Sequence, residues 1–286
     1  MKKPNLTKSS VTVFGLSPSI DQASKPSDLI QINGHQTLTL YARRCITILW
    51  HNAHRQGIET NKQYSIETHE LVQNEHKGFA RAEDAIIQLM QTILTIKCDD
   101  GSTSRVQFLG GNNLSDETKS AGVLKYNFDP LLISILENAD IWGKISLPIL
   151  MSLSSKYGVS LYENVCQWTG LTRKTSQKMT LEEFRELLGV EGKKYSSFGV
   201  LNTHVIKTVV REINALAPFN VSILPIKTGK KVTDIRIGWW DKSDEEMKLA
   251  WAETNRSRIG RKARISGQEE HVIDPSPSVY KMSKKK

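Results

Sequence analysis

Apolar residues recur every three or four positions along residues 198–216, which is the spacing of the buried face of a helix. The members of this stripe are Phe198, Leu201, Val205, Val209, Ile213 and Leu216. Two shorter helical patterns precede it, over residues 152–170 and 180–189. The second of these opens with Thr180 and Glu183, a pair that forms a capping box at the start of a helix. The pattern therefore predicts three helices in succession.

The period changes from helical to alternating beyond Pro218. Apolar and polar residues alternate over residues 220–226 and 231–240, and the segment Lys-Thr-Gly-Lys between them is typical of a tight turn. A β-hairpin is expected there. Three helices followed by a hairpin are the order of a winged helix, which is a helix-turn-helix motif with a two-stranded wing.

The first half of the chain repeats this order less sharply. Helical patterns cover residues 38–56, 65–73 and 78–93, and a hairpin is predicted around the turn dipeptide Asp100-Gly101. The first of these helices is basic, with Arg43 and Arg44 among its residues. The predicted fold class is α+β, with two tandem winged-helix domains at about residues 36–140 and 145–240.

Both ends of the chain lack this periodicity. Residues 1–35 are rich in Ser, Pro and Lys, and a flexible arm is expected. The region 241–286 begins with one predicted helix capped by Ser243 and Glu246, and its residues 256–264 are strongly basic. We expect a flexible basic arm that contacts phosphates; a solvated tail that only aids solubility is the alternative.

Charge narrows the classes of partner. The 286-residue chain has a formal net charge of +9 and a pI of about 9.3, which favours nucleic acid or another polyanion as its partner.

Its three cysteines form no CxxC pair, so neither a disulfide framework nor a zinc site is indicated, and no metal or cofactor is expected. No apolar run is long enough to span a membrane, and the N-terminus lacks a secretory pattern; a cytoplasmic location is expected.

Candidate DNA-binding residues of the second domain lie in three places. The turn before the third helix supplies Lys193, Lys194, Tyr195, Ser196 and Ser197, where free amides at a helix N-terminus favour phosphate. The polar face of that helix supplies Asn202, Thr203, His204, Lys207 and Arg211. The first three are expected to meet base edges and the last two to meet phosphates. The predicted wing places Lys227, Lys230 and Lys231 at or beside its tip.

The first domain offers fewer candidates. Arg81 lies on the outer side of its third helix, Gln88 could read adenine from the same helix, and Arg105 lies in its hairpin. Glu83 and Asp84 on that helix would repel phosphate, so the first domain is expected to be the weaker DNA reader. For all of these residues the alternative is the ordinary solvated face of an amphipathic helix or hairpin.

The order and spacing of several short segments resemble one family. The segments are residues 155–157, 161–163, 181–190, 195–198, 211–214 and 227–237. In them the sequence resembles the second winged helix of the Rep_3 (RepB/RepE/Pi-like) superfamily of plasmid replication initiators, and the first half resembles the first winged helix less distinctly. Members of that family often have arginine at the start of the third helix, where this chain is nearly uncharged, so arginine–guanine contacts are not expected there.

The resemblance implies a function. Family members bind repeated sequences (iterons) at a plasmid origin, help to open the duplex and recruit the host initiator and replicative helicase. Many also dimerise through the first domain and repress their own gene as dimers, so dimerisation through the first domain and an equilibrium between monomer and homodimer are expected here. The alternative is a winged-helix transcriptional repressor without a role in replication.

An enzyme is the third possibility. A rolling-circle nickase needs two histidines separated by one residue near a tyrosine, and an NTPase needs a P-loop; neither pattern occurs in the sequence. The chain is therefore expected not to be an enzyme.

Overall fold

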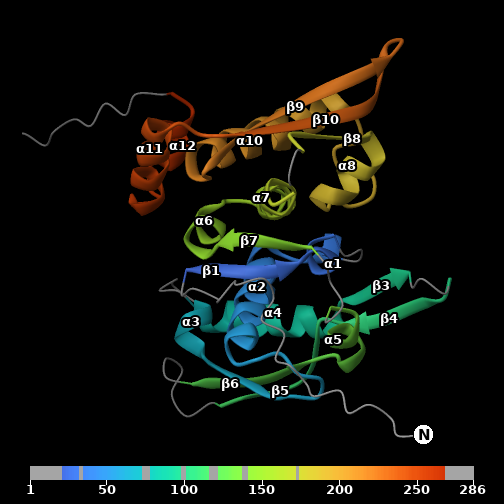
Figure 1. Cartoon of the computed structure of the whole chain (residues 1–286), viewed down its shortest axis with the longest axis vertical. Coiled ribbons are helices and arrows are strands. Elements are labelled where there is room, and N and C mark those ends of the chain that lie inside the picture. The colour runs from blue at the N-terminus through green and yellow to red at the C-terminus, as the bar shows by residue number, and fades with distance from the viewer. Residues whose placement is uncertain are drawn as a thin grey trace, which may run out of the picture.

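The computed structural model describes residues 21–31, 35–72, 78–97, 101–115, 122–136, 141–171 and 174–267. Two units of helices and strands lie one above the other along the long axis of the molecule (Figure 1). Each has its own cluster of buried apolar side chains.

The second domain contains the predicted helices and hairpin together with one further strand. Its elements are α7 (Lys156–Thr169), β8 (Ser176–Thr180), α8 (Leu181–Leu188), α9 (Phe198–Leu201), the π-helical turn η2 (Asn202–Ile206), α10 (Lys207–Leu216), β9 (Phe219–Thr228) and β10 (Lys231–Asp241). The strands form one antiparallel sheet in the order β8-β10-β9. The sequence did not predict β8, because its residues are exposed or half-buried and are extended through pairing with the distant β10.

Helices α9, η2 and α10 follow one another without a break and form the predicted third helix. Of the apolar stripe, Leu201, Val205 and Ile213 are at most 2% exposed and belong to the core of the second domain. The capping box of Thr180 and Glu183 is present at the start of α8 as predicted. Local sequence rules therefore explain this half of the fold well.

The first domain follows the same scheme with more strands. Its elements are α2 (Leu40–Arg55), β2 (Tyr64–Glu67), α3 (Thr68–Val72), α4 (Gly78–Gln91), β3 (Ile93–Lys97), β4 (Thr103–Gln107), β5 (Leu109–Leu114), β6 (Val123–Phe128) and α5 (Pro130–Leu136). The predicted hairpin is the antiparallel pair β3-β4. The predicted helix over residues 65–73 is wrong in its first part, since Tyr64 and Ile66 are buried and pair with Tyr126 and Leu124 of β6.

The junction between the domains is built from segments that the sequence did not predict as folded. These are β1 (Gln22–Pro26), α1 (Ser27–Ile30), the 3₁₀ helix η1 (His35–Thr37), β7 (Trp142–Ser146) and α6 (Leu147–Ser152). Strand β1 pairs antiparallel with β7, and Ala23 is fully buried. The prediction of a flexible arm over residues 1–35 is thus wrong for residues 22–30; residues 1–20 lie outside the described residues.

Charged side chains are buried where α2 of the first domain packs against α7. The Lys25 ammonium lies 2.8 and 3.0 Å from the two carboxylate oxygens of Glu163, and the Thr47 hydroxyl donates to the same carboxylate at 2.9 Å. Arg43 donates to the Ser160 hydroxyl, and Arg44 donates to backbone carbonyls of α6 and the residue after it. Arg43 and Arg44 therefore hold the two domains together and are not presented to a partner.

The C-terminal region is more ordered than predicted. The predicted helix after Ser243 is present as α11 (Asp244–Asn255), with its capping box. A second helix, α12 (Arg261–Ile265), follows, and its first residue is 5% exposed. The prediction of a flexible basic arm over 241–286 is therefore wrong up to residue 267, where the described residues end. None of the helices in the described part of the chain combines the length and the hydropathy that a bilayer span requires.

Candidate nucleic-acid interface

The turn before the third helix is held in shape by an arginine of α8. Arg185 donates hydrogen bonds to the carbonyls of Gly192, Lys194 and Tyr195 at 2.7–3.0 Å. Tyr195 has a φ of 51°, a left-handed conformation that non-glycine residues adopt only when their surroundings fix it. This turn exposes Lys193, Lys194, Ser196 and Ser197.

The start of the third helix is capped within the same turn. The Ser197 hydroxyl accepts a hydrogen bond from the Val200 amide at 3.3 Å. Tyr195 is half-buried, and its ring lies between Tyr157 and His204, with ring centroids 6.1 and 6.2 Å away. The ring of Tyr195 thus packs against the ring of His204, and the exposed side chains of the turn are its lysines and serines.

The polar face of the third helix is exposed as predicted. Thr203, His204, Lys207 and Arg211 are exposed, and Asn202 is half-buried. Thr208, which the sequence reading passed over, is exposed beside them. Its position one residue after Lys207 and three before Arg211 could have identified it, because residues three and four apart share a helix face.

A π-helical turn over Asn202–Ile206 lies in the middle of this surface. The buried stripe advances by four residues at each step from Leu201 to Ile213, whereas an α-helix turns once in about 3.6 residues. A wider turn keeps a stripe of this spacing on one face of the helix. Short π turns of this kind are frequent at functional sites, and here the turn coincides with the residues predicted to meet bases.

The wing carries its lysines at an exposed tip. Lys227, Lys230 and Lys231 are all exposed, and Gly229 has a φ of 61° at the first central position of the two-residue turn. That conformation suits glycine, which lacks the Cβ that would strain it. The long hairpin β9-β10 projects beyond the rest of the second domain (Figure 1).

A register shift interrupts the alternation of β10 near the tip of the wing. The pairing with β9 skips from Val232 to Asp234, which is a β-bulge at Thr233. Beyond the bulge, Ile235 and Ile237 face the core and Arg236 is exposed. Arg236 therefore lies on the outer face of the sheet, away from the core side.

The three residues of the first domain that were predicted to bind DNA differ in their exposure. Arg81 on α4 and Arg105 on β4 are exposed. Gln88 is half-buried, and its side-chain carbonyl accepts hydrogen bonds from the amide and the hydroxyl of Thr39, 3.2 and 3.1 Å away. Because Thr39 is the N-cap of α2, Gln88 has a structural partner that a base would have to displace.

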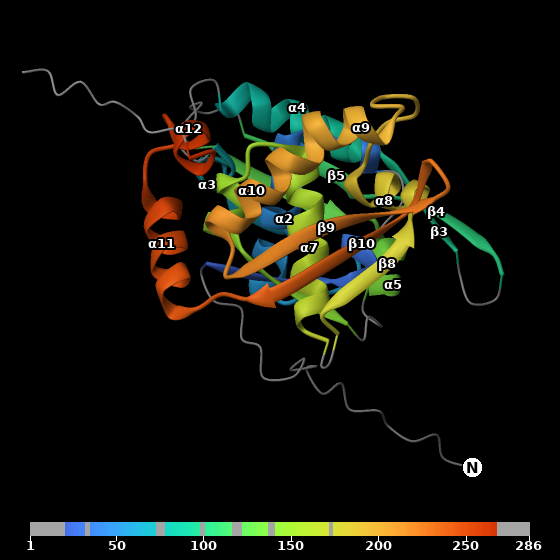
Figure 2. The ribbon, with the colours of Figure 1, turned by 90° about the horizontal axis from the view of Figure 1, so that it is seen from above.

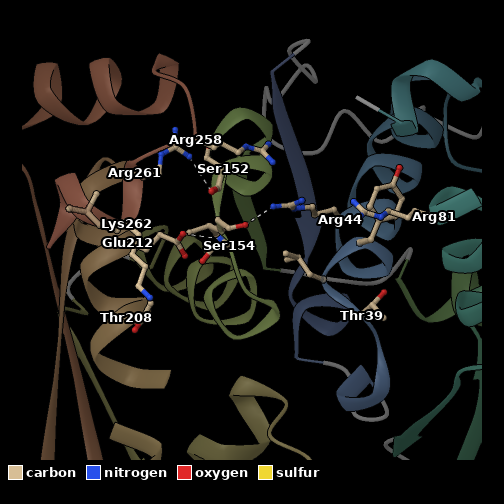
Figure 3. Close-up of a pocket in the computed structure, with 14 residues that line it drawn as sticks. Thr39, Arg44, Arg81, Ser152, Ser154, Thr208, Glu212, Arg258, Arg261 and Lys262 are labelled. Carbon is tan, nitrogen blue, oxygen red and sulfur yellow. Dashed lines mark hydrogen bonds between the residues drawn. The ribbon is translucent and has the colours of Figure 1, made fainter. Parts of the chain in front are cut away.

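The third helices of the two domains face the same side of the molecule. Helix α10 lies above α4 in Figure 1, and seen from above α4 and the start of α9 lie along one edge (Figure 2). A cleft of about 580 Å³ lies between them, with Arg81 of α4 and Thr208 of α10 among its lining residues. Figure 3 shows this cleft with helix α12 along its second-domain wall.

One carboxylate lies inside the cleft. Glu212 is 3% exposed; one of its oxygens accepts from the Ser154 amide at 2.9 Å, and Oε2 has no hydrogen-bond partner among the described residues. Burial raises the pKa of Glu212, and this outweighs the hydrogen bond from Ser154 and the nearby Arg261 and Arg44, which lower it.

This raised pKa predicts how stability responds to pH. A carboxyl whose pKa is higher in the folded state favours folding when protonated and disfavours it as pH rises through its folded pKa. Glu212→Gln should therefore become increasingly more stable than the parent as the pH rises above about 4, where an unfolded glutamate begins to ionise. The check is urea denaturation of both proteins at each pH, with the exposed Glu182→Gln as control. A stability difference that stays constant or reverses with pH would contradict the assignment.

Comparison with known proteins places this arrangement in a family. A model described as "Initiator Replication protein, WH1" matches residues 22–166, which is more than half of the chain, and one described as "Initiator Rep protein, WH2" matches residues 180–239. The chain belongs to the Rep_3 family of plasmid replication initiators. The predicted family and the fold class of two tandem winged helices are confirmed, and the replication role distinguishes this initiator from a simple repressor.

A solved structure agrees with this fold over most of the chain. The Pi initiator protein in complex with iteron DNA matches with a TM-score of 0.63 at 14% identity, covering 80% of this chain and all of that one. The WH1 domain of MSBI1.176, a replication protein isolated from a multiple sclerosis patient, matches at 19% identity with a TM-score of 0.28, covering 35% of this chain and 84% of that one. No curated protein matches the Rep_3 chain.

Proposed function

We propose that this Rep_3 initiator binds short direct repeats, or iterons, in the duplex DNA of a plasmid origin. One observation carries the proposal: the third helices of both winged-helix domains face the same side of the molecule, with a cleft between them. A major groove is wide enough for one α-helix, and successive major grooves on one face of B-DNA lie about 34–36 Å apart. The relation to a protein bound to iteron DNA supports the same ligand.

The second domain acts as the main DNA reader. Thr203, His204 and Asn202 meet base edges from the third helix, while Lys207 and Arg211 meet phosphates at the groove edge. Further phosphate contacts come from the turn and the wing, through Lys193, Lys194, Tyr195, Ser196, Ser197, Lys227, Lys230 and Lys231. Tyr195 takes part through its backbone and by positioning His204, since its ring packs inward.

The first domain contributes mainly to affinity. Arg81 and Arg105 are exposed and contact phosphates. Gln88 reads adenine only by giving up its hydrogen bonds to Thr39, which makes it the weakest of the proposed readers.

Binding is the start of a longer process. The initiator helps to open the origin, recruits the host initiator and the replicative helicase, and exchanges between monomer and homodimer; family membership supports these roles. It acts in the cytoplasm, where plasmid DNA lies, by binding and not by catalysis. Nicking of supercoiled origin DNA by the purified protein would contradict the last statement.

Footprinting of the DNA that flanks its own gene tests the proposal. We expect protection of short, regularly spaced direct repeats. Uniform protection of all sequences would refute sequence-specific binding, and a replicon that copies normally without the gene would refute the role in initiation.

The readers on the third helix can be tested separately. The double variant Thr203→Ala/His204→Ala should reduce the preference for the protected repeat over a scrambled duplex by about 30-fold or more, because two good base contacts contribute at least about 1 kcal/mol each. Competition binding measures this ratio, and the salt dependence should stay unchanged since no phosphate contact is removed. The exposed His69→Ala serves as control; an unchanged ratio in the double variant would rule out base reading by these two residues.

A further inference from the structure

Helix α12 and the turn before it lie outside both family models, the second of which ends at residue 239. They nevertheless line the cleft between the two third helices, through Arg258, Arg261 and Lys262. This segment therefore brings basic side chains to the centre of the proposed DNA-binding side, at a point that neither third helix occupies.

A single carboxylate orders the segment. Glu253 of α11 accepts from Arg261 at 3.1 Å and from Arg264 at 2.8 and 3.0 Å. The two arginines also donate to carbonyls of the turn, including those of Arg256, Ser257 and Ile259. The contacts with Arg264, and to a smaller extent Arg261, lower the pKa of Glu253, so it stays ionised and holds both guanidinium groups.

The ordered segment is tied to α6 at the domain junction and to the end of α10 in the second domain. Arg261 donates to the carbonyl of Ser152 in α6 at 3.2 Å. At the other end of α11, the Lys242 ammonium donates to the carbonyls of Asn214 and Ala217 at 2.5 and 2.7 Å. The turn and α12 consequently have a fixed position relative to the third helix of the second domain.

The cleft is strongly cationic. Its lining has five cationic side chains, and Glu212 is the one carboxylate among the described residues that line it. Arg44 and Arg261 are buried and donate to carbonyls of residues 151–153, whereas Arg81, Arg258 and Lys262 are exposed at the rim. Arg81 comes from the first domain, Arg258 and Lys262 come from the C-terminal segment, and all three line the same cleft.

We infer that this rim binds the phosphodiester backbone of the DNA between the two major grooves that the domains enter. The inference rests on the proposed function, since it takes the two third helices to bind one duplex. A strand that passes from one major groove to the next must cross the surface between α4 and α10, which is where Arg81, Arg258 and Lys262 lie. Phosphate contacts there fix the register of both domains on the duplex without reading sequence.

The direct test is the double variant Arg258→Ala/Lys262→Ala. It should bind the protected repeat about tenfold more weakly, and the slope of log affinity against log salt should fall by about 1.8, because each neutralised phosphate contributes about 0.9. The ratio of affinities for repeat and scrambled duplex should not change. The control Lys125→Ala/Lys248→Ala removes two exposed lysines that do not line the cleft and should retain the parent's slope.

A second variant tests whether the C-terminal segment binds phosphate from fixed positions or attracts DNA only through its charge. Glu253→Ala adds one positive charge but removes the group that holds Arg261 and Arg264. If Arg258 and Lys262 act from fixed positions, binding should weaken several-fold despite the added charge. Equal or tighter binding would show that the segment acts only as a charged tail and would overturn the inference.

The position on the DNA is tested with the ligand itself. Neutral methylphosphonate linkages at the centre of the repeat should weaken binding by the parent and leave the Arg258→Ala/Lys262→Ala variant almost unaffected. Weakening of both proteins to the same extent would contradict contact at the centre. Competition by inorganic phosphate below millimolar concentration would instead assign the rim to a free anion.

The outcomes separate this inference from the proposed function. If the parent prefers the repeat but the double variant keeps its affinity and slope, the rim is not a phosphate site and the proposed function stands. If the parent shows no preference, the proposed function fails. The slope measured on a random duplex still tests the rim, because phosphate contacts do not depend on sequence.

Discussion

Affinity for duplex DNA is expected to fall by about a thousandfold when alanine replaces four exposed lysines: Lys193, Lys194, Lys230 and Lys231. The magnitude follows from about 1 kcal/mol for each lost phosphate contact. The slope of log affinity against log salt should fall by about 3.6, since four phosphates are no longer neutralised. Fluorescence anisotropy titrations over a range of salt concentrations measure both quantities.

The expected loss depends on where the lysines lie. Two are in the turn that Arg185 holds, just before the third helix, and two are at the tip of the wing, so they approach the duplex from two separate elements. The matched control replaces four other exposed lysines with alanine: Lys125, Lys144, Lys174 and Lys248. Because both variants have the same net charge, an equal loss in the control would mean that overall charge, and not the turn and wing, attracts DNA.

Sequence rules with a short reach predicted the second domain well. The stripe from Leu201 to Leu216, the capping box at Thr180 and the turn at Gly229 each depend on residues a few positions apart, and each is present in the structure. The exposure of His204 and Lys207 follows from the same stripe, because a buried face leaves the opposite face outside. The exposed residues of the third helix could therefore be predicted from the sequence alone.

Features that depend on distant partners could not be read from the sequence. Strand β1 is extended because it pairs with β7, more than a hundred residues later, and β8 pairs with the distant β10. Arg43 and Arg44 look like solvated charges on a helix, but docking of α2 against α7 buries both. Whether these side chains are buried depends on how the two domains pack against each other.

The candidate site shows the same division. Gln88 has the side-chain amide that reading adenine requires. Its carbonyl, however, accepts a hydrogen bond from Thr39, the N-cap of α2, which lies 49 positions earlier in the chain. The basic residues after Asn255 were expected in a flexible arm, because no local pattern shows that Glu253 gathers Arg261 and Arg264. A cluster of arginines beside one acidic residue is a sign of order that composition alone does not reveal.

The free energy of unfolding should decrease by about 3–5 kcal/mol when Glu163 is replaced by leucine. The Glu163 carboxylate accepts from Lys25 at 2.8 and 3.0 Å and from Thr47 at 2.9 Å, in a site where neither charged side chain is more than 7% exposed. Without it the Lys25 ammonium stays buried with the Thr47 hydroxyl, 3.3 Å away, as its remaining side-chain partner among the described residues. Urea denaturation followed by tryptophan fluorescence measures the loss, and Trp50, which donates to the carbonyl of Ser24, reports on this junction.

The double variant Lys25→Met/Glu163→Leu distinguishes a lost charge partner from a packing defect. Because the cost of the single variant comes mainly from an unpaired buried charge, removing that charge as well should restore most of the stability. Glu59→Gln is the surface control: it breaks the ion pair that the exposed Glu59 forms with Lys62 and should cost less than about 1 kcal/mol. If the double variant is as unstable as Glu163→Leu, the space between α2 and α7, and not the ion pair, determines how firmly the two domains are joined.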